Sequence, residues 1–258
     1  MSFLKLATSR LIQFFGNALK AIFFLFHIFF PNKRFIIPRY SKPLISIASV
    51  SRIPRIIWQT NYTSSVTLPV YINYLWNRLM APTYDHYYWV DQDRIDFISS
   101  VYGSDVLNVF MRLKIGAAQA DYWRILVLLK HGGVYLDVDA AFCWPIAFTL
   151  GKSLEELFIC PTGKPVTNYF IASKPGHPII DKISRQIKVN IERQDSNSIY
   201  DLTGPVVVER IITDTQCEVR PANLVCKQGI FVQKKYQYPD KTQVHWIEEE
   251  KKGGIYND

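Results

Sequence analysis

The stretch Ala117–Ala140, AAQADYWRILVLLKHGGVYLDVDA, decides the fold of this 258-residue chain. Residues 116–131 have the length and apolar content of a buried helix, a Gly-Gly pair ends it, and residues 134–136 form a short apolar strand. Two carboxylates follow, Asp137 and Asp139, on either side of one valine. Alternate residues of a strand point to the same face, so this spacing predicts that both side chains project together from the strand end.

A pair of neighbouring carboxylates suits a divalent cation that prefers oxygen ligands, Mn²⁺ or Mg²⁺, and such a cation in turn suits a diphosphate. Without a cation the two charges repel and raise the pKa of one carboxyl group. Asp121 and Arg124 lie three residues apart on the preceding helix, so they share one face of it. Because their neighbours are apolar, we expect the pair to face the same cleft and to bind hydroxyl groups. The alternatives are solvated loop aspartates and a structural ion pair.

The surrounding pattern alternates strands and helices, which is typical of an α/β sheet with helices on both faces. We expect this domain to occupy residues 51–258. Strands are predicted at 53–60, 87–90, 157–160 and 168–172, and helices at 68–80, 94–102, 106–114, 116–131, 178–192 and 206–212.

Residues 1–50 differ from the rest and are predicted to be a membrane-associated helix followed by a linker. Leu11–Phe30 is about 20 residues long, enough to cross a bilayer. Its polar residues recur at helical spacing, which favours a membrane-embedded or interfacial amphipathic helix over a true span. A cleaved signal peptide and a buried core helix are the remaining alternatives. The polar stripe consists of Gln13, Asn17, Lys20 and His27.

Composition restricts the functions further. The formal charge is +8, with 48% hydrophobic and 20% charged residues, an ordinary balance for a globular protein. The charge could attract nucleic acid, an anionic membrane or phosphorylated small molecules. No Arg- and Lys-rich stripe interleaves with aromatic residues, so nucleic acid is not expected as a partner. The four cysteines lie far apart, without a zinc or redox motif.

The segment Ala117–Ala140 resembles the sugar-binding, DXD-containing region of glycosyltransferase family 32. This group includes mannosyltransferases and many bacterial capsule and lipopolysaccharide enzymes, and the clostridial glucosylating toxins are distant relatives. The resemblance spans roughly residues 52–246. Further blocks carry it in order: IPRIIWQT at 53–60, YYWVDQD at 87–93, NYFIASKPGHPII at 168–180, TGP at 203–205 and His245-Trp246.

The resemblance implies a GT-A fold, a Rossmann-like mixed sheet that binds a nucleotide-sugar. Asp139 and Asp137 would be the catalytic carboxylates, with Asp139 a direct ligand of Mn²⁺ or Mg²⁺. Asp137 would bind ribose and sugar hydroxyls and help to hold the metal. Asp121 and Arg124 would hold the donor sugar, and His245 would complete the metal sphere. A structural role for His245 is the alternative.

Other positions are carried over with their alternatives. Trp58 matches the aromatic residue that stacks on the nucleotide base in the toxins, and the alternative is a buried core tryptophan. Asn168, Thr203 and Gly204 are predicted to line the acceptor side.

These expectations describe a metal-dependent, retaining glycosyltransferase. It would move a sugar from a nucleotide-sugar donor to a glycan or glycolipid acceptor of the lipopolysaccharide, capsule or mannosyl-lipid type. The membrane surface would be contacted through residues 11–30, at the cytoplasmic face of a bacterial inner membrane or at a Golgi-type membrane. The alternatives are a membrane-tethered, non-catalytic binding module and a haloacid-dehalogenase-like phosphatase, whose strand-end Asp-x-Asp is superficially similar.

Overall fold

The computed structural model describes residues 2–47, 50–194, 196, 198–240 and 254–257. Seven strands form the main sheet: β2 (Tyr40–Ser41), β3 (Ile56–Thr60), β5 (Asp85–Trp89), β6 (Gly133–Leu136), β8 (Glu156–Cys160), β9 (Thr167–Ser173) and β10 (Val219–Pro221). Their order is β10-β8-β9-β6-β3-β5-β2. Two small sheets pair β1 (Phe35–Ile36) with β4 (Ser65–Val66), and β7 (Ala140–Phe142) with β11 (Cys226–Gln228).

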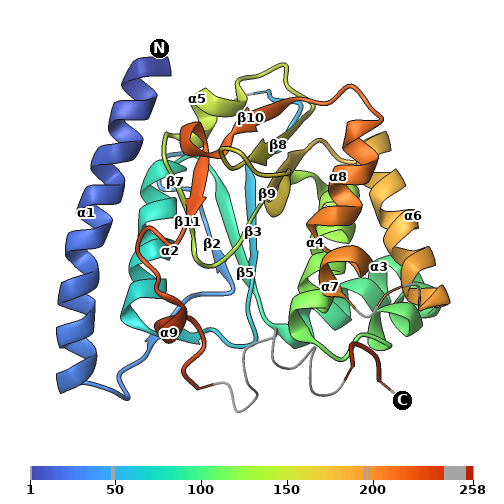
Figure 1. Cartoon of the computed structure of the whole chain (residues 1–258), viewed down its shortest axis with the longest axis horizontal. Helices are drawn as coiled ribbons and strands as arrows, with labels where there is room; N and C mark the ends of the chain where they lie inside the picture. The colour runs from blue at the N-terminus through green and yellow to red at the C-terminus, as the bar shows by residue number, and fades with distance from the viewer. Residues whose placement is uncertain (1, 48–49, 195, 197, 241–253, 258) are drawn as a thin grey trace.

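Helices cover both faces of the main sheet, as the sequence predicts (Figure 1). The helices are α1 (Ser2–Phe29), α2 (Leu68–Met80), α3 (Asp91–Met111), α4 (Gly116–His131), α5 (Ile146–Leu150), α6 (Pro178–Arg193), α7 (Ile199–Leu202), α8 (Pro205–Thr213), the 3₁₀ helix η1 (Ala222–Leu224) and α9 (Lys234–Gln237). Helices α1 and α2 lie on one side of the sheet, whereas α3, α4, α6, α7 and α8 lie on the other. The mixed α/β class is therefore confirmed.

The centre of the sheet is parallel and leads to the predicted site. Strand β3 pairs in parallel with both β5 and β6, while β9 runs antiparallel to β6. All four residues of β6 are buried, which explains its uninterrupted apolar sequence. The carboxyl ends of the three parallel strands consequently meet at one edge, and the two aspartates follow β6 there.

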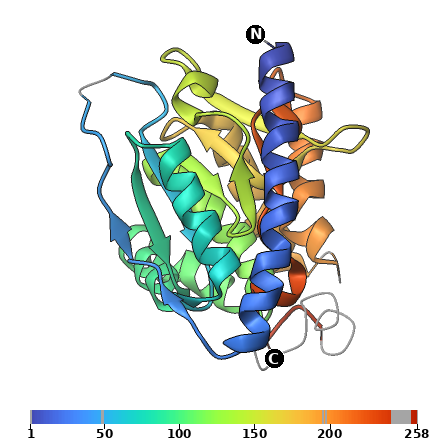
Figure 2. The same ribbon diagram turned by 90° about the vertical axis from the view of Figure 1, so that its left-hand side faces the viewer.

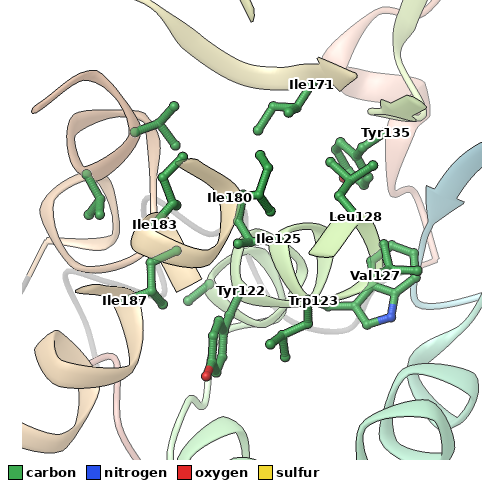
Figure 3. Packing of buried hydrophobic residues seen from close by; sticks show 14 of the residues in the cluster. Tyr122, Trp123, Ile125, Val127, Leu128, Tyr135, Ile171, Ile180, Ile183 and Ile187 are labelled. Carbon is green, nitrogen blue, oxygen red and sulfur yellow. The ribbon is translucent and has the colours of Figure 1, made fainter. Parts of the chain in front are cut away.

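Helix α4 is the central helix of the larger core. Its residues 121–128 are all buried, because the helix is packed between the sheet and α6. In Figure 3, Ile125 points toward Ile180 and Ile183 of α6, and Leu128 lies next to Tyr135 of β6. Aromatic and branched side chains fill this layer, so α4 holds its one charged pair inside an apolar environment.

Most predicted elements are present, with differences at short segments. The helices predicted at 68–80 and 116–131 match α2 and α4 at both ends. The segments predicted at 94–102 and 106–114 form one element, α3, which Gly103 interrupts with φ 76° and ψ −174°. This left-handed φ is accessible to glycine at little cost, which accounts for the break. The pattern did not predict α5 or β7, because such short elements show little periodicity.

Helix α1 lies along the outside of the domain, with one narrow face against α2 and η1 (Figure 2). A side chain at Gly16 would come within 2.5 Å of the Ile230 carbonyl oxygen, so the helix backbone touches the segment that follows β11. The helix is long and apolar enough to cross a membrane by length and composition. Of the predicted polar stripe only His27 is buried, and Gln13 and Asn17 are exposed. The buried face consists instead of Ser9, Ile12, Gly16, Phe23 and His27.

Candidate active site

The two aspartates lie on a turn and not on a continuous strand. Strand β6 ends at Leu136, and the Ala140 N–H donates to the Asp137 carbonyl at 3.0 Å, which closes the turn. The prediction that the two side chains converge because they alternate along a strand is therefore wrong. The side chains converge nevertheless, since Gln228 Nε2 lies 3.1 Å from Asp137 Oδ2 and 3.1 Å from Asp139 Oδ1.

Two buried asparagines of α2 hold this turn. Asn73 Nδ2 donates to the carbonyls of Val138 and Ala140, both at 2.9 Å, and Asn77 Nδ2 donates to Ala140 at 2.8 Å. Asn77 Oδ1 in turn accepts from the Phe142 N–H at 3.0 Å. Both asparagines are fully buried, one helical turn apart. The sequence analysis missed them, although two asparagines at this spacing within an apolar helix are a usable signal, since buried amides need partners.

The predicted donor-sugar pair belongs to the same site. Arg124 Nη2 lies 2.8 Å from Asp121 Oδ1 and 3.4 Å from Asp137 Oδ1. This guanidinium therefore connects the helix to the turn at residues 137–140, which we call the carboxylate turn. Asn168 Nδ2 and Thr203 Oγ1 donate to Asp121 at 3.0 and 3.3 Å. Two residues predicted for the acceptor side are thus bonded directly to the predicted donor-sugar aspartate.

Burial dominates the electrostatics of the site. It raises the pKa of Asp121 to about 7, against the opposing effect of Arg124. Burial also raises the pKa of Asp139 to about 7, and repulsion from Asp137 adds to the shift. Burial raises the pKa of Asp137 as well, while Arg124 and the hydrogen bond from the Tyr135 hydroxyl at 2.7 Å oppose that rise. The carboxylate turn therefore favours a positive ion or a proton.

The carboxylate turn fits a hard divalent cation. Asp137 and Asp139 present oxygens to a common point, and carboxylate oxygen is the ligand that Mn²⁺ and Mg²⁺ prefer. Within the part of the chain that the structure describes, no group of three His, Cys, Asp or Glu side chains could hold a metal. His245 and Trp246 lie outside the described residues. The role of His245 as a metal ligand stays a prediction, and among the described residues any further ligand would be another oxygen donor, such as an amide group.

Trp58 belongs to the core, which corrects the prediction that it stacks on a base. It is 3% exposed, its ring stacks on Tyr87 at 4.7 Å, and its Nε1 donates to the Gly132 carbonyl at 2.9 Å. The position lies two residues before the end of β3, so its side chain packs beneath α4 and not at the edge of the sheet. The alternative of a buried core tryptophan describes its surroundings.

Close backbone contacts at position 204 leave no room for a side chain. Its N–H donates to the Ile199 carbonyl at 2.9 Å, and a Cβ here would lie 2.8 Å from the Tyr200 Cα. Its place on the acceptor side stays a prediction.

Gln59 is a further contact that the sequence analysis missed. Its Nε2 donates to the Asp137 carbonyl at 3.2 Å, and its Oε1 lies 2.8 Å from His86 Nε2. Burial lowers the pKa of His86 to about 3, so the ring is neutral and carries its proton on Nε2. Gln59 thereby fixes the backbone at the start of the carboxylate turn from β3.

A surface hollow of about 460 Å³ lies at the opposite, amino end of β3 and β5. Ile53, Arg55 and Asp85 contribute to its wall, and it contains none of the predicted site residues. The chemistry of the carboxylate turn, and not the size of this hollow, therefore identifies the candidate site.

Paired carboxylates after a central strand, with a buried Asp–Arg pair beside them, define this chain as an α/β domain with a candidate cation site. Residues 67–157 match the family described as glycosyltransferase sugar-binding region containing DXD motif. This segment spans α2, α3, α4 and the carboxylate turn, and the match agrees with the resemblance noted in the sequence.

Curated proteins with similar sequences are named glycosyltransferases. An uncharacterized glycosyltransferase of Acanthamoeba polyphaga mimivirus is 32% identical over 132 residues, covering 49% of this chain and 51% of that protein. An initiation-specific alpha-1,6-mannosyltransferase of Schizosaccharomyces pombe is 25% identical over 192 residues, covering 63% of this chain and 48% of that protein. The chain thus spans about half the length of these relatives.

Solved structures show a partial likeness. The PaToxG glycosyltransferase has a TM-score of 0.43 and 17% identity, covering 63% of this chain and 69% of that one. The UDP-bound glycosyltransferase domain of the YGT toxin has a TM-score of 0.39 and 12% identity, covering 61% and 55%.

Proposed function

We propose that this protein is a metal-dependent, retaining glycosyltransferase that takes a sugar from a nucleotide-sugar donor. One observation supports this most strongly: Arg124 joins Asp137, one of the two converging carboxylates, to the buried hydroxyl-binding candidate Asp121. A cation subsite and a sugar subsite would therefore adjoin in a chain whose residues 67–157 match a glycosyltransferase sugar-binding region.

Each residue has a role that follows from its contacts. Asp137 and Asp139 would hold Mn²⁺ or Mg²⁺, which when bound neutralises negative charge on the leaving diphosphate. Asp121 and Arg124 would orient the sugar through its hydroxyl groups, so that its anomeric carbon faces the acceptor. Asn168 and Thr203 keep Asp121 oriented through their hydrogen bonds. Retention of configuration rests on the family resemblance.

The acceptor is proposed to be a glycan or a glycolipid at a membrane surface. Support comes from α1, which exposes many large apolar side chains and lies along the outside of the domain (Figures 1 and 2). An interfacial position fits this arrangement better than a span, because a span would remove Gly16 and Ile12 from their protein contacts. The exposed apolar side chains of α1 are Leu4, Leu11, Phe14, Phe15, Ile22, Phe24, Leu25, Ile28 and Phe29.

The test is donor binding by the full chain in mild detergent. Thermal unfolding is recorded with UDP- and GDP-sugars, each with and without Mn²⁺, because a ligand that binds the folded state raises the unfolding temperature. We expect stabilisation by one donor class that requires Mn²⁺ and is lost in Asp139→Ala. Absence of any donor-dependent shift with the wild-type chain would refute the proposal.

The same variant separates the two alternatives. A phosphatase would lose hydrolysis of phosphate monoesters in Asp139→Ala, whereas a non-catalytic module would bind donor without any turnover to lose. The carboxylate turn follows β6 in the middle of the chain, in a segment that matches the glycosyltransferase family. We therefore favour transfer over both alternatives.

A further inference from the structure

Gln228 lies against both catalytic carboxylates from a part of the sequence that no motif identified. It is the last residue of β11, which pairs antiparallel with β7 so that Gln228 faces Ala140. The next residue, Gly229, donates its N–H to the Asp139 carbonyl at 3.0 Å. The end of β11 is therefore attached to the carboxylate turn by backbone as well as by side chain.

The amide nitrogen of Gln228 stands where a cation would stand. Its Nε2 is 3.1 Å from one oxygen of Asp137 and 3.1 Å from one oxygen of Asp139. An ionised carboxylate only accepts hydrogen bonds, so the NH₂ end of the amide and not its oxygen faces the pair. The two N–H groups bridge the like charges and offset part of their repulsion.

The other end of the same amide is an oxygen of the kind that Mn²⁺ and Mg²⁺ accept as a ligand. Half a turn about the terminal carbon–carbon bond of the side chain exchanges nitrogen and oxygen without moving the backbone. We infer that Gln228 exchanges its two ends on cation binding, from a donor to Asp137 and Asp139 into an oxygen ligand of the metal. This inference rests on the proposed function, because it assumes the cation site at the carboxylate turn.

Three observations support this exchange. The backbone around Gln228 is held by the pairing with β7 on one side and by the close approach of α1 to Ile230 on the other. The side chain itself is exposed, so it has room to rotate. Among the residues that the structure describes, no third His, Cys, Asp or Glu completes a metal cluster, and the amide oxygen supplies a further ligand.

The experiment measures Mn²⁺ binding to the full chain by electron paramagnetic resonance of the free ion, without donor or acceptor. If Gln228 is a ligand, Gln228→Leu weakens Mn²⁺ binding by about 10-fold or more. Gln228→Glu keeps an oxygen and adds a charge, so it binds Mn²⁺ at least as tightly as the wild type. Gln233→Leu, an exposed glutamine five residues further on, is the matched control and leaves binding unchanged.

The outcomes separate this inference from the proposed function. Tighter Mn²⁺ binding in Gln228→Leu would show that the amide only competes with the cation, and unchanged binding would show that it does neither; both overturn the inference. In those cases loss of binding in Asp139→Asn still supports the metal site. A wild-type chain that binds no Mn²⁺ would overturn the metal site and the inference together.

Discussion

Removing the charge of Arg124 tests the buried ion pair that this residue forms within α4. In Arg124→Met the apolar stem of the side chain is kept while the guanidinium is lost. Asp121 and Asp137 then lose their common countercharge, and the Asn168 carbonyl loses a hydrogen bond of 2.6 Å.

The expected loss of unfolding free energy in Arg124→Met follows from the burial of the ion pair. Arg124 and Asp121 are 5% and 8% exposed, so water cannot replace the lost partner. Breaking a buried pair by removing one member costs about 3–5 kcal/mol of unfolding free energy. For a chain of this size that corresponds to a fall in the unfolding temperature of about 10 °C.

The assay is thermal unfolding by circular dichroism, with Arg185→Met as the matched control. Arg185 forms a pair with Asp181 at the surface of α6, where its side chain is 77% exposed. Such an exposed pair contributes at most about 1 kcal/mol, so this control is expected to unfold within about 3 °C of the wild type.

The pH dependence supplies a second measurement. The pKa of Asp121 is raised to about 7, so the folded state binds more protons than the unfolded state between about pH 4 and pH 7. The contribution of Asp121 to stability therefore falls as pH rises through that range. Without Arg124 this pKa rises further, so Arg124→Met is expected to lose more stability at pH 8 than at pH 5.5.

A double variant isolates the cause. Adding Asp121→Asn to Arg124→Met removes a buried charge that has no partner, so the double variant is expected to be more stable than Arg124→Met alone. Equal small losses in Arg124→Met and Arg185→Met, or no gain in the double variant, would refute the reasoning about the buried pair.

Four further predictions follow from the site and from α1. Because a proton competes with the cation at Asp139, whose pKa is raised to about 7, Mn²⁺ affinity measured by calorimetry should weaken by up to about tenfold per pH unit below 7 and level off above it. Asn77→Ala, which leaves the Ala140 carbonyl and Phe142 N–H without their side-chain partner, should lower stability by about 1–3 kcal/mol in thermal unfolding and also weaken Mn²⁺ binding. Gly16→Val should lower the unfolding temperature, whereas Ala18→Val on the exposed face of the same helix should leave it unchanged. Phe15→Asp should reduce co-sedimentation with vesicles of phosphatidylcholine and phosphatidylglycerol without lowering the unfolding temperature, and unchanged sedimentation would argue against membrane contact through this face.

The sequence predicted the larger elements and the partners within α4 because their signals are local. The ends of α2 and α4 follow from apolar periodicity and from the Gly-Gly stop, and Asp121 and Arg124 pair across one helical turn. Trp58 was different: the sequence shows an aromatic residue near a strand end, but only the tertiary packing decides whether its ring faces solvent. The structure buries it beneath α4 and against Tyr87.

The residues that the sequence could not assign act across long separations. Gln228 reaches Asp139 over 89 residues and Asn73 reaches Val138 over 65, and neither spacing has a local pattern. Their positions are set by β11 pairing with β7 and by α2 packing on the turn. Short strands such as these have too few residues for alternation to be recognised, so the contacts become visible only when the sheet is assembled.

Helix α1 helps to hold one side of the candidate site in place. The helix touches the segment after β11 at Gly16, Lys227 donates to Gln13 at 2.9 Å, and Tyr236 stacks on His27 at 4.7 Å. These contacts hold the side of the site that carries Gln228, whereas α2 and α4 hold the side that carries Asp137. We therefore expect removal of α1 to disturb β11 before it disturbs the Asp121–Arg124 pair. With its exposed face on the membrane and its buried face beside β11, α1 would hold the cation site close to the membrane surface that carries the acceptor.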